Sequence, residues 1–571
     1  MKKNLLASAL ISALFLISST FSYAQHNEKC LAEIMFWEAA KVDPSLLINR
    51  LMLDQETENA IAAGETYKSS AVTKIIPVVV HVIHEGGSEN ISIAQIEDQI
   101  RILNEDFKRL NADTTNTPGP FKPLAGHPDV EFRLATKDPN GNCTNGIVRV
   151  FSPLTNNARN NVKALSYWPR DKYLNYWTVK SIESTSGGSG IVIGFAQFPG
   201  GNAPTDGVVV RADYTGNIGT AANNGDKGRV ATHEVGHWLN LRHIWGDAQC
   251  GDDQVGDTPQ QFGPNQSNCP AFPKTSNCIN NGPNGDMFMN YMDYTNGSCQ
   301  NMFSAGQAIR MNVTLNNSLS SRNNLWTQAN LIATGTDDNA IPQACAPVAD
   351  FWSDTEFVCV GNNVNFYEGS WNGIPTSFEW ILPGTVSGLS TDTNPTVQYT
   401  TPGIYGATLI VSNSQGSDTL TKNVVVNVLH QYGTRWVPDL ENFEAPFSFP
   451  GWEWYVFNEG GNTWEHNIVA AHTGTHSVWI NNYAGNVPAK TDVFLTPAYN
   501  LTYSTNTFAK FWVAYAVRTS ASTDQLRVFV STTCGQFWTQ RLSKTGTTLA
   551  TAGLVTNTAF IPNNPNQWRE E

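Results

Sequence analysis

HEVGHWLNLRH, from His233 to His243, is the stretch that decides the fold of this chain. His233 and His237 stand four residues apart, so on a helix they share one face, where two imidazoles can bind the same Zn²⁺. Glu234 projects beside them and is the candidate general base for a water activated by that zinc. His243 can become the third ligand only if the helix ends and the backbone turns near Asn240. Asparagine is the residue that, after glycine, best tolerates the positive φ of such a turn.

MNYMDY, from Met289 to Tyr294, is a second motif downstream of the first. By itself this motif would indicate an aromatic segment of the hydrophobic core. Behind three histidines it is typical of the Met-turn of metzincins, in which a methionine, here Met292, forms an apolar floor beneath the metal ligands. Tyr294 is then the candidate that supports the metal or donates a hydrogen bond to the negative oxygen of the reaction intermediate.

The first 24 residues predict an export signal. Lysines at positions 2 and 3 precede an apolar run over residues 5–17, and small residues precede a predicted cut before Gln25. The run is too short to cross a bilayer, and no other stretch reaches the roughly 20 apolar residues that are needed. We expect a secreted, extracellular protein in a compartment where disulfides persist, with attachment to a cell surface left open.

Residues 25–70 are predicted to form a polar, helical pro-segment that carries an isolated cysteine, Cys30. Two interpretations of this cysteine stand side by side. Its thiolate can take the fourth position on the zinc and keep the enzyme latent. Alternatively, Cys30 is a stray thiol or an unpaired half of a disulfide.

Residues 71–335 predict an α/β (α+β) catalytic domain. β-Branched residues over 75–83 are typical of a buried strand. A helix follows, with Ser92 and Gln95 as a capping box at its start. Further strands are predicted at Val130–Leu134, Tyr173–Val179 and Gly207–Arg211. The helix that carries the histidines is predicted at roughly Gly228–Leu241.

The loop after the histidine helix concentrates cysteines and acids. An even number of cysteines in an exported, loop-rich region predicts two disulfides, with three pairings open, among Cys250, Cys269, Cys278 and Cys299. Carboxylates on a glycine-rich loop suit Ca²⁺, which prefers oxygen ligands. The carboxylates of this loop belong to Asp247, Asp252, Asp253 and Asp257. Solvated acids without an ion are the equally weighted alternative.

From about residue 335 the pattern becomes all-β, with short alternating strands between turn signals. Residues 346–430 resemble a PKD-type, immunoglobulin-like sandwich, through W-x-x-P-G at Trp380–Gly384 and the later N-P-T-V-Q-Y and P-G-x-Y pieces. Cys345 and Cys359 are expected to pair around its first strand. Residues 432–571 look like a jelly-roll sandwich. Its tryptophans can stack sugars, although buried tryptophans are commoner; the candidates are Trp452, Trp454 and Trp464.

The length and net charge of the chain limit its possible domain organisation and function. The chain has 571 residues, which implies several domains, and 35 Lys+Arg against 49 Asp+Glu, which gives a net charge of -14. This acidity argues against nucleic-acid binding. Protein or peptide substrates are the expected partners, and the β domains offer contact with an extracellular polysaccharide or surface. The chain stops at Trp568–Glu571 without a turn or tail, which indicates a fragment.

Together the motifs resemble the pappalysin (cytophagalysin) family of metzincin zinc metalloproteases over roughly Cys30–Leu325. The resemblance is carried by Cys30, IPVVVH at 76–81, LNEDF at 103–107, the histidine helix, DTP at 257–259 and NYMDY at 290–294. Two departures remove no ligand, since Asn240 replaces the glycine of the turn and Leu31 follows Cys30 where glycine is frequent.

The resemblance implies specific roles. Zinc would be held by His233, His237 and His243, with Glu234 as the base and Cys30 as the latency thiol. Calcium would lie near Asp252, Asp257 and Thr258. The disulfides would be Cys250–Cys278 and Cys269–Cys299.

The sequence thus predicts a secreted zinc endopeptidase, made as a latent zymogen, with one catalytic Zn²⁺ and a structural Ca²⁺. The alternative is a surface-binding or adhesive protein with a non-catalytic protease scaffold, against which the intact ligands and Glu234 weigh. The loop after the Met-turn, Thr295–Cys299, is uncharged, and Asp293 is expected to be structural. We therefore expect broad cleavage in which basic side chains are favoured only weakly.

Overall fold

The structure is a computed structural model. It describes residues 29–66, 72–184, 191–222, 224–266, 269–341, 343–430, 433–444, 454–458, 462–483, 491–555 and 557–571. The predicted export signal and Trp452 lie outside these residues. In the part of the chain that is described, no helix is long and apolar enough to cross a membrane.

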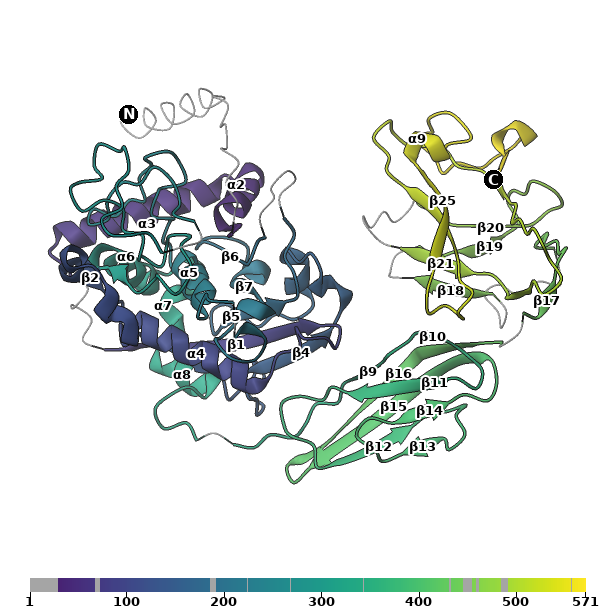
Figure 1. The fold of residues 1–571 in the computed structure, drawn as a ribbon, viewed down its shortest axis with the longest axis horizontal. Helices are drawn as coiled ribbons and strands as arrows, with labels where there is room; N and C mark the ends of the chain where they lie inside the picture. Colours follow the sequence, from purple (N-terminus) through teal and green to yellow (C-terminus); the bar gives the residue numbers. More distant parts are fainter. Residues whose placement is uncertain are drawn as a thin grey trace. The chain divides into compact units, whose positions relative to one another are not determined.

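A six-stranded sheet organises the first compact unit, which extends to Ala346 and includes Trp371–Ile374 (Figure 1). The strand order is β3-β1-β5-β7-β6, and β4 also pairs with β1. All pairs are parallel except that of β6, which runs antiparallel to β7 at the edge. The strands are β1 (Lys74–His84), β3 (Val130–Leu134), β4 (Ile147–Phe151), β5 (Leu174–Val179), β6 (Gly194–Ala196) and β7 (Val208–Arg211).

β1 explains why the sheet needs layers on both faces. Every residue from Lys74 to His84 is buried, although successive side chains of a strand point to opposite faces. Val78 and Val80 belong to the main apolar cluster, whereas Val79 and Ile83 belong to separate clusters. A nearly continuous β-branched run is therefore required, as parallel sheets covered on both sides require in general.

Two helices share one face of this sheet. α4 (Ile93–Phe107) packs against β3, α5 (Arg229–Trp238) packs against β6 and β7, and the two helices contact each other. Ser92 caps α4 by accepting the N–H of Gln95 at 3.2 Å. The predicted capping box is only half formed, because the Gln95 amide instead donates to the carbonyls of Ala212 and Thr215 at 3.0 and 2.9 Å. The glutamine thereby ties α4 to the chain that leaves β7.

The remaining elements of this unit complete its core. Two helices precede the sheet, and three follow the Met-turn motif. They are α2 (Ala32–Val42), α3 (Ser45–Ala62), α6 (Ala305–Asn316), α7 (Arg322–Leu325) and α8 (Gln328–Thr334), with the short pair β2 (Ala125–Gly126) and β8 (Phe303–Ser304). Short 3-10 helices are η2 (Ala112–Asn116), η3 (Gly119–Leu124), η4 (Pro153–Thr155), η5 (Asn160–Ala164), η6 (Ala203–Thr205), η7 (Ala212–Tyr214), η8 (Gly219–Ala221) and η9 (Leu319–Ser321).

The second unit begins with a β-sandwich, as predicted. A five-stranded sheet of order β10-β16-β15-β12-β13 faces a three-stranded sheet of order β14-β11-β9 around a core that includes the fully buried Trp380. The strands are β9 (Phe351–Ser353), β10 (Phe357–Cys359), β11 (Asn363–Glu368), β12 (Ser377–Ile381), β13 (Leu389–Ser390), β14 (Thr396–Gln398), β15 (Gly403–Asn413) and β16 (Gly416–Leu429).

The last part of the chain is also β-rich, and its described strands form two-stranded pairs. They are β17 (Arg435–Trp436) with β22 (Tyr499–Asn500), β18 (Tyr455–Asn458) with β21 (Asp492–Leu495), β19 (Glu465–Asn467) with β20 (Ser477–Trp479), β23 (Trp512–Val513) with β26 (Arg569–Glu570), and β24 (Gln525–Val530) with β25 (Thr539–Thr545). The short helices α9 (Gly546–Leu549) and η10 (Pro565–Gln567) complete it. Trp454 is buried, and the indole N–H of Trp464 donates to the Asp492 carbonyl at 3.0 Å. Trp454 therefore serves packing, whereas Trp464 is half-buried and its contact with sugars stays a prediction.

The expected pair Cys345–Cys359 is wrong. Cys345 bonds instead to Cys143, in the loop before β4, and Cys359 bonds to Cys534. Each true partner lies more than 170 positions away in sequence, at separations of 202 and 175 residues. Nearness along the chain was a poor guide because the fold, and not the local segment, brings these cysteines together.

Candidate active site

α5 and the turn after it bring the three histidines to one point. His233 and His237 lie on one face of α5, which ends at Trp238. Asn240 then adopts a φ of 74°, which is the left-handed turn predicted for this position, and His243 folds back. The Nε2 atom of His237 lies 3.1 Å from Nε2 of His233 and 3.1 Å from Nε2 of His243.

The outer nitrogen of each imidazole determines its protonation. Nδ1 of His233 lies 2.7 Å from the Tyr291 carbonyl, and Nδ1 of His237 lies 2.7 Å from the Leu241 carbonyl. Nδ1 of His243 lies 2.5 Å from an oxygen of Asp247. Each Nδ1 must donate to its acceptor, so each Nε2 presents a lone pair to the common point. Three lone pairs at this separation repel one another unless a cation lies between them, which is the donor set that Zn²⁺ takes.

Cys30 completes a group of four buried ligand atoms with these histidines. The Cys30 sulfur and the three histidine nitrogens all lie within 4.8 Å of one another, and no other such cluster of His, Cys, Asp and Glu occurs in the described residues. The thiol also donates to Oε2 of Glu234 at 3.3 Å. Burial raises the pKa of Glu234 to about 8 and raises that of Cys30 as well, since both charged forms lose water. A dication at the histidines would favour both charged forms.

The chain around Cys30 pairs with the edge strand of the sheet. The Lys29 carbonyl accepts the N–H of Ile193 at 2.8 Å, and the N–H of Leu31 donates to the Gly194 carbonyl at 3.3 Å. Residues 29–31 thus use the free backbone groups of β6, as added strands do. Gly194 cannot be replaced without movement, because a Cβ there would come within 2.5 Å of Oε1 of Glu234.

Met292 lies beneath the histidine helix and is fully buried. A Cβ at Gly236 would lie 2.5 Å from the Met292 sulfur, so the glycine of the HEVGH segment leaves room for the methionine. Tyr294 follows, with its ring centroid 5.7 Å from that of His233 and 5.0 Å from that of His243. Its hydroxyl donates to the Cys30 carbonyl at 3.4 Å.

Asp106, at the end of α4, holds the two halves of the site together. It accepts hydrogen bonds from the Thr232 hydroxyl of α5 at 2.8 Å and from the Tyr291 hydroxyl at 2.7 Å. Arg229 reaches the same carboxylate at 3.3 Å. Tyr291 in turn presents the carbonyl that orients His233. The motif LNEDF contains this residue, but its role was not foreseen, since the sequence does not show that α4 meets the Met-turn.

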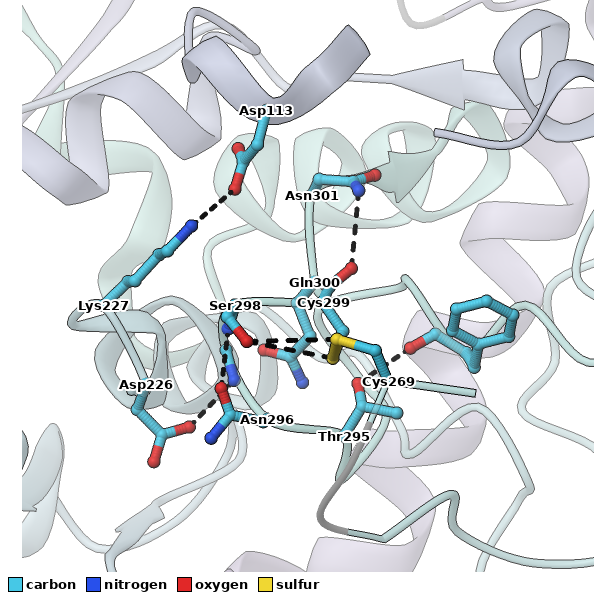
Figure 2. Close-up of a disulfide and its surroundings, with 12 residues drawn as sticks. Asp113, Asp226, Lys227, Cys269, Thr295, Asn296, Ser298, Cys299, Gln300 and Asn301 are labelled. Carbon is cyan, nitrogen blue, oxygen red and sulfur yellow. Dashed lines mark hydrogen bonds and ion pairs between the residues drawn. A yellow bond between two sulfur atoms is a disulfide. The ribbon is translucent and has the colours of Figure 1, made fainter. Parts of the chain in front are cut away.

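A small cavity beside the histidines is lined by Lys29, Asp226, Glu234, Tyr294, Thr295 and Gln300, among others. Asp226 precedes α5 and is buried, and its Oδ1 accepts the N–H of Gly297 at 3.0 Å. Figure 2 shows Asp226 facing the loop Thr295–Gln300, whereas its neighbour Lys227 points away to Asp113, 3.5 Å distant. Burial raises the pKa of Asp226, and the charge of Lys29 opposes that rise.

This cavity bears on cleavage preference. The loop after the Met-turn carries no charge, as its sequence shows, but an acid reaches the same wall from the segment before α5. The disulfide Cys269–Cys299 anchors that loop at one end (Figure 2), and the Gly297 N–H joins it to Asp226. Asp226 was not foreseen from the sequence, and broad cleavage stays a prediction.

The acidic residues of the loop after α5 are the predicted calcium ligands. Asp257 accepts hydrogen bonds from the Ser304 hydroxyl and the Gly306 N–H, and Asp252 accepts the Gln254 N–H. Asp253 lies 2.9 and 3.0 Å from the Thr258 hydroxyl, and burial raises its pKa to about 7. Within the described residues these acids do not gather into one ligand group. The calcium site stays a prediction.

The two loop disulfides are Cys250–Cys278 and Cys269–Cys299, the pairs that the family resemblance implies. Cys30 is buried and is the free cysteine of the described residues.

Comparison with known proteins agrees with this geometry. The sequence model of the Peptidase_M43 family, described as pregnancy-associated plasma protein-A, matches residues 157–316. An extracellular metalloprotease of Trichophyton verrucosum is 30% identical over 245 residues, which cover 41% of this chain and 75% of that protein. One of Arthroderma otae is 29% identical over 274 residues, covering 45% and 84%.

Two solved structures are also similar. Promirolysin from Tannerella forsythia is 42% identical, with coverage of 53% of this chain and 98% of that one and a TM-score of 0.46. The PKD1 domain of the Vibrio cholerae metalloprotease PrtV is 33% identical, with coverage of 14% and 98% and a TM-score of 0.13. The site and the relatives define a metalloprotease. The chain belongs to the pappalysin family, as its motifs predicted.

Replacing Asp106 by alanine should destabilise the protein by about 2–4 kcal/mol, because it leaves two buried hydroxyls without their acceptor, while Arg229 keeps Asp113 as its partner. Urea unfolding measures this loss. Glu105→Gln on the same helix is the matched control, since its pair with Arg101 is exposed and is worth less than about 1 kcal/mol. An Asp106→Ala loss as small as the control's would show that the carboxylate does not join the two halves.

Proposed function

We propose that this protein is a secreted zinc endopeptidase that is made as a latent precursor. The observation that carries the proposal is the convergence of three unprotonated imidazole nitrogens beside one buried carboxylate. The names of the relatives support secretion, since they are called extracellular metalloproteases. The same reasoning favours His233, His237 and His243 as the zinc ligands.

Zinc bound there supplies a Lewis acid that polarises the scissile carbonyl and acidifies a water. Glu234 accepts a proton from the attacking water and returns it to the leaving amine, for which its position beside the three nitrogens suits it. The Tyr294 hydroxyl is a donor for the carbonyl oxygen as that oxygen gains negative charge. Met292 fixes the floor on which the histidines rest.

The proposed latency rests on the contacts that residues 29–31 make with the active site. The Cys30 sulfur occupies the place beside Glu234 where a reacting water would be needed, and the Tyr294 hydroxyl is engaged with the Cys30 carbonyl. The backbone of the pro-segment takes the edge of β6 that an extended substrate would use. The precursor is therefore blocked at the metal, at the base and at the strand edge.

The cavity at Asp226 favours a basic side chain next to the scissile bond. Lys29, adjacent to Cys30, lines this cavity and donates to the Tyr294 carbonyl at 2.9 Å. A buried carboxylate that faces a cationic side chain in the precursor can bind a substrate lysine or arginine once the pro-segment has left.

Glu234→Ala should keep one equivalent of zinc but lose at least about 100-fold in kcat on a denatured protein, since the attacking water loses its base. Metal analysis and a casein assay measure the two effects. Glu97→Gln, an exposed glutamate on α4, is the control and should stay active. Undiminished activity of Glu234→Ala would refute this mechanism.

Cys30→Ala should make the precursor process itself faster or show activity before processing, because the histidines and Glu234 lose their blocking ligand. Time courses on gels and a peptide assay measure this. Lys41→Ala, on the exposed side of α2, controls for general loosening of the pro-segment. A silent and stable Cys30→Ala precursor would mean that the pro-segment blocks the cleft without its thiol.

Asp226→Asn should lower kcat/KM for peptides with lysine or arginine next to the scissile bond by roughly 10- to 100-fold, as expected for loss of a charge-assisted hydrogen bond. Peptides with neutral residues there should be cleaved as before. Asp171→Asn, an exposed aspartate, is the control. Equal losses on basic and neutral peptides would assign Asp226 a structural role only.

A further inference from the structure

Asp54 on α3 ties the pro-segment to two arginines of the catalytic unit. One carboxylate oxygen accepts a hydrogen bond from Arg242 at 2.5 Å, and the other accepts one from Arg310. The Arg310 side chain is 1% exposed and that of Arg242 is 18% exposed. Two guanidinium groups thus share one carboxylate in a largely buried position.

Arg310 is held by the catalytic unit itself. Nε of Arg310 donates to the carbonyl of Asn240, the residue of the turn between His237 and His243, at 2.7 Å. Arg242 immediately precedes His243 in the chain. Arg310 therefore has an anchor that does not depend on the pro-segment, and the backbone of Arg242 is fixed beside His243.

The surface beneath the pro-segment is continuous from the histidines to this pair. Cys30 lies at the histidines, and the ring of Phe36 packs on Phe198 with centroids 5.6 Å apart. Phe198 in turn lies 5.2 Å from the His237 ring. One turn before Asp54, the Arg50 guanidinium covers the Phe198 ring at 4.8 Å. A polypeptide that replaces the pro-segment over this surface reaches both arginines.

Asp54 is the main attractive charge for the pair. Burial and the nearby Arg50 lower the pKa of Arg242 to about 10, while Asp54 opposes both. Burial also lowers the pKa of Arg310, and Asp54 is the first opposing charge, with Asp253 a lesser one. Removal of the pro-segment takes away Asp54, Glu33 and Arg50 together. It leaves two adjacent cations without the carboxylate that they share, an arrangement that binds a carboxylate well.

We propose that in the processed enzyme Arg242 and Arg310 form a carboxylate-binding subsite that takes an acidic side chain of the polypeptide substrate. Asp54 occupies this subsite in the precursor. The inference rests on the proposed function, because it requires that the pro-segment leave and that a polypeptide take its place.

The anion site can be tested without catalysis, in the full-length precursor carrying Glu234→Gln. Adding Asp54→Ala removes the carboxylate and should lower the melting temperature. Sodium formate, the probe, should then raise the melting temperature saturably by at least about 2 °C more than sodium chloride of equal ionic strength, because it binds only the folded form. The parent with Asp54 should show no such difference.

Glu58→Ala, an exposed glutamate on the same helix, is the matched control and should respond equally to both salts. Arg310→Met added to Asp54→Ala should abolish the formate effect. Equal responses to formate and chloride in Asp54→Ala would overturn the anion site, whatever the enzyme does to peptides.

The substrate role is tested on the processed full-length enzyme with peptide pairs that carry aspartate or asparagine at each position around the cut. At one position aspartate should raise kcat/KM about 10-fold over asparagine, the size of a charge-assisted contact. In Arg242→Gln that ratio should fall to near 1. A ratio near 1 at every position in the wild type would overturn the proposal, while cleavage of the neutral peptides would leave the proposed protease function standing.

Discussion

Three imidazole lone pairs must face one point, and much of the first unit serves this constraint. α5 supplies two of them and has to stop at Trp238 so that the chain can bring back the third. Asn240 makes this reversal with a positive φ, and its carbonyl is held by Arg310. Asp106 ties α5 to the Met-turn, whose Tyr291 carbonyl orients His233. Without a cation the arrangement would be repulsive, so the proposed zinc would also stabilise this part of the fold.

Close approach of backbone to catalytic groups is the second requirement, and two glycines meet it. Gly194 lets the edge strand β6 pass against Glu234, and Gly236 lets Met292 rise beneath the helix. The same edge strand receives residues 29–31. The pro-segment therefore contacts the groups on which the proposed chemistry depends, and further contacts to the catalytic unit follow at Phe36 and Asp54. In the proposed function, latency and substrate binding therefore use the same surface.

Where local reasoning failed, a long-range contact was responsible. Gln95 has the spacing of a capping box, but its amide bonds to the chain after β7 because that chain lies within reach. Cys345 and Cys359 are near in sequence, but each finds its partner more than 170 positions away. Asp226 belongs to no recognisable motif, and only the loop Thr295–Gln300 packed against it reveals that it lines the cavity.

The sequence by itself determined the candidate ligands, the base, the Met-turn, the α/β order of the first unit and the all-β character of the second. These features depend on spacing within one helix, one turn or one strand, so they can be read from a short window. The tertiary structure alone decided which imidazole nitrogen faces the common point, what Asp106 joins, where Asp226 points and which cysteines pair. It also decided that Asp54 meets Arg242 and Arg310. The contacts of Asp54, Asp106 and Asp226 and the disulfide Cys143–Cys345 join residues about 70 to 260 positions apart, and only packing of the whole core specifies them.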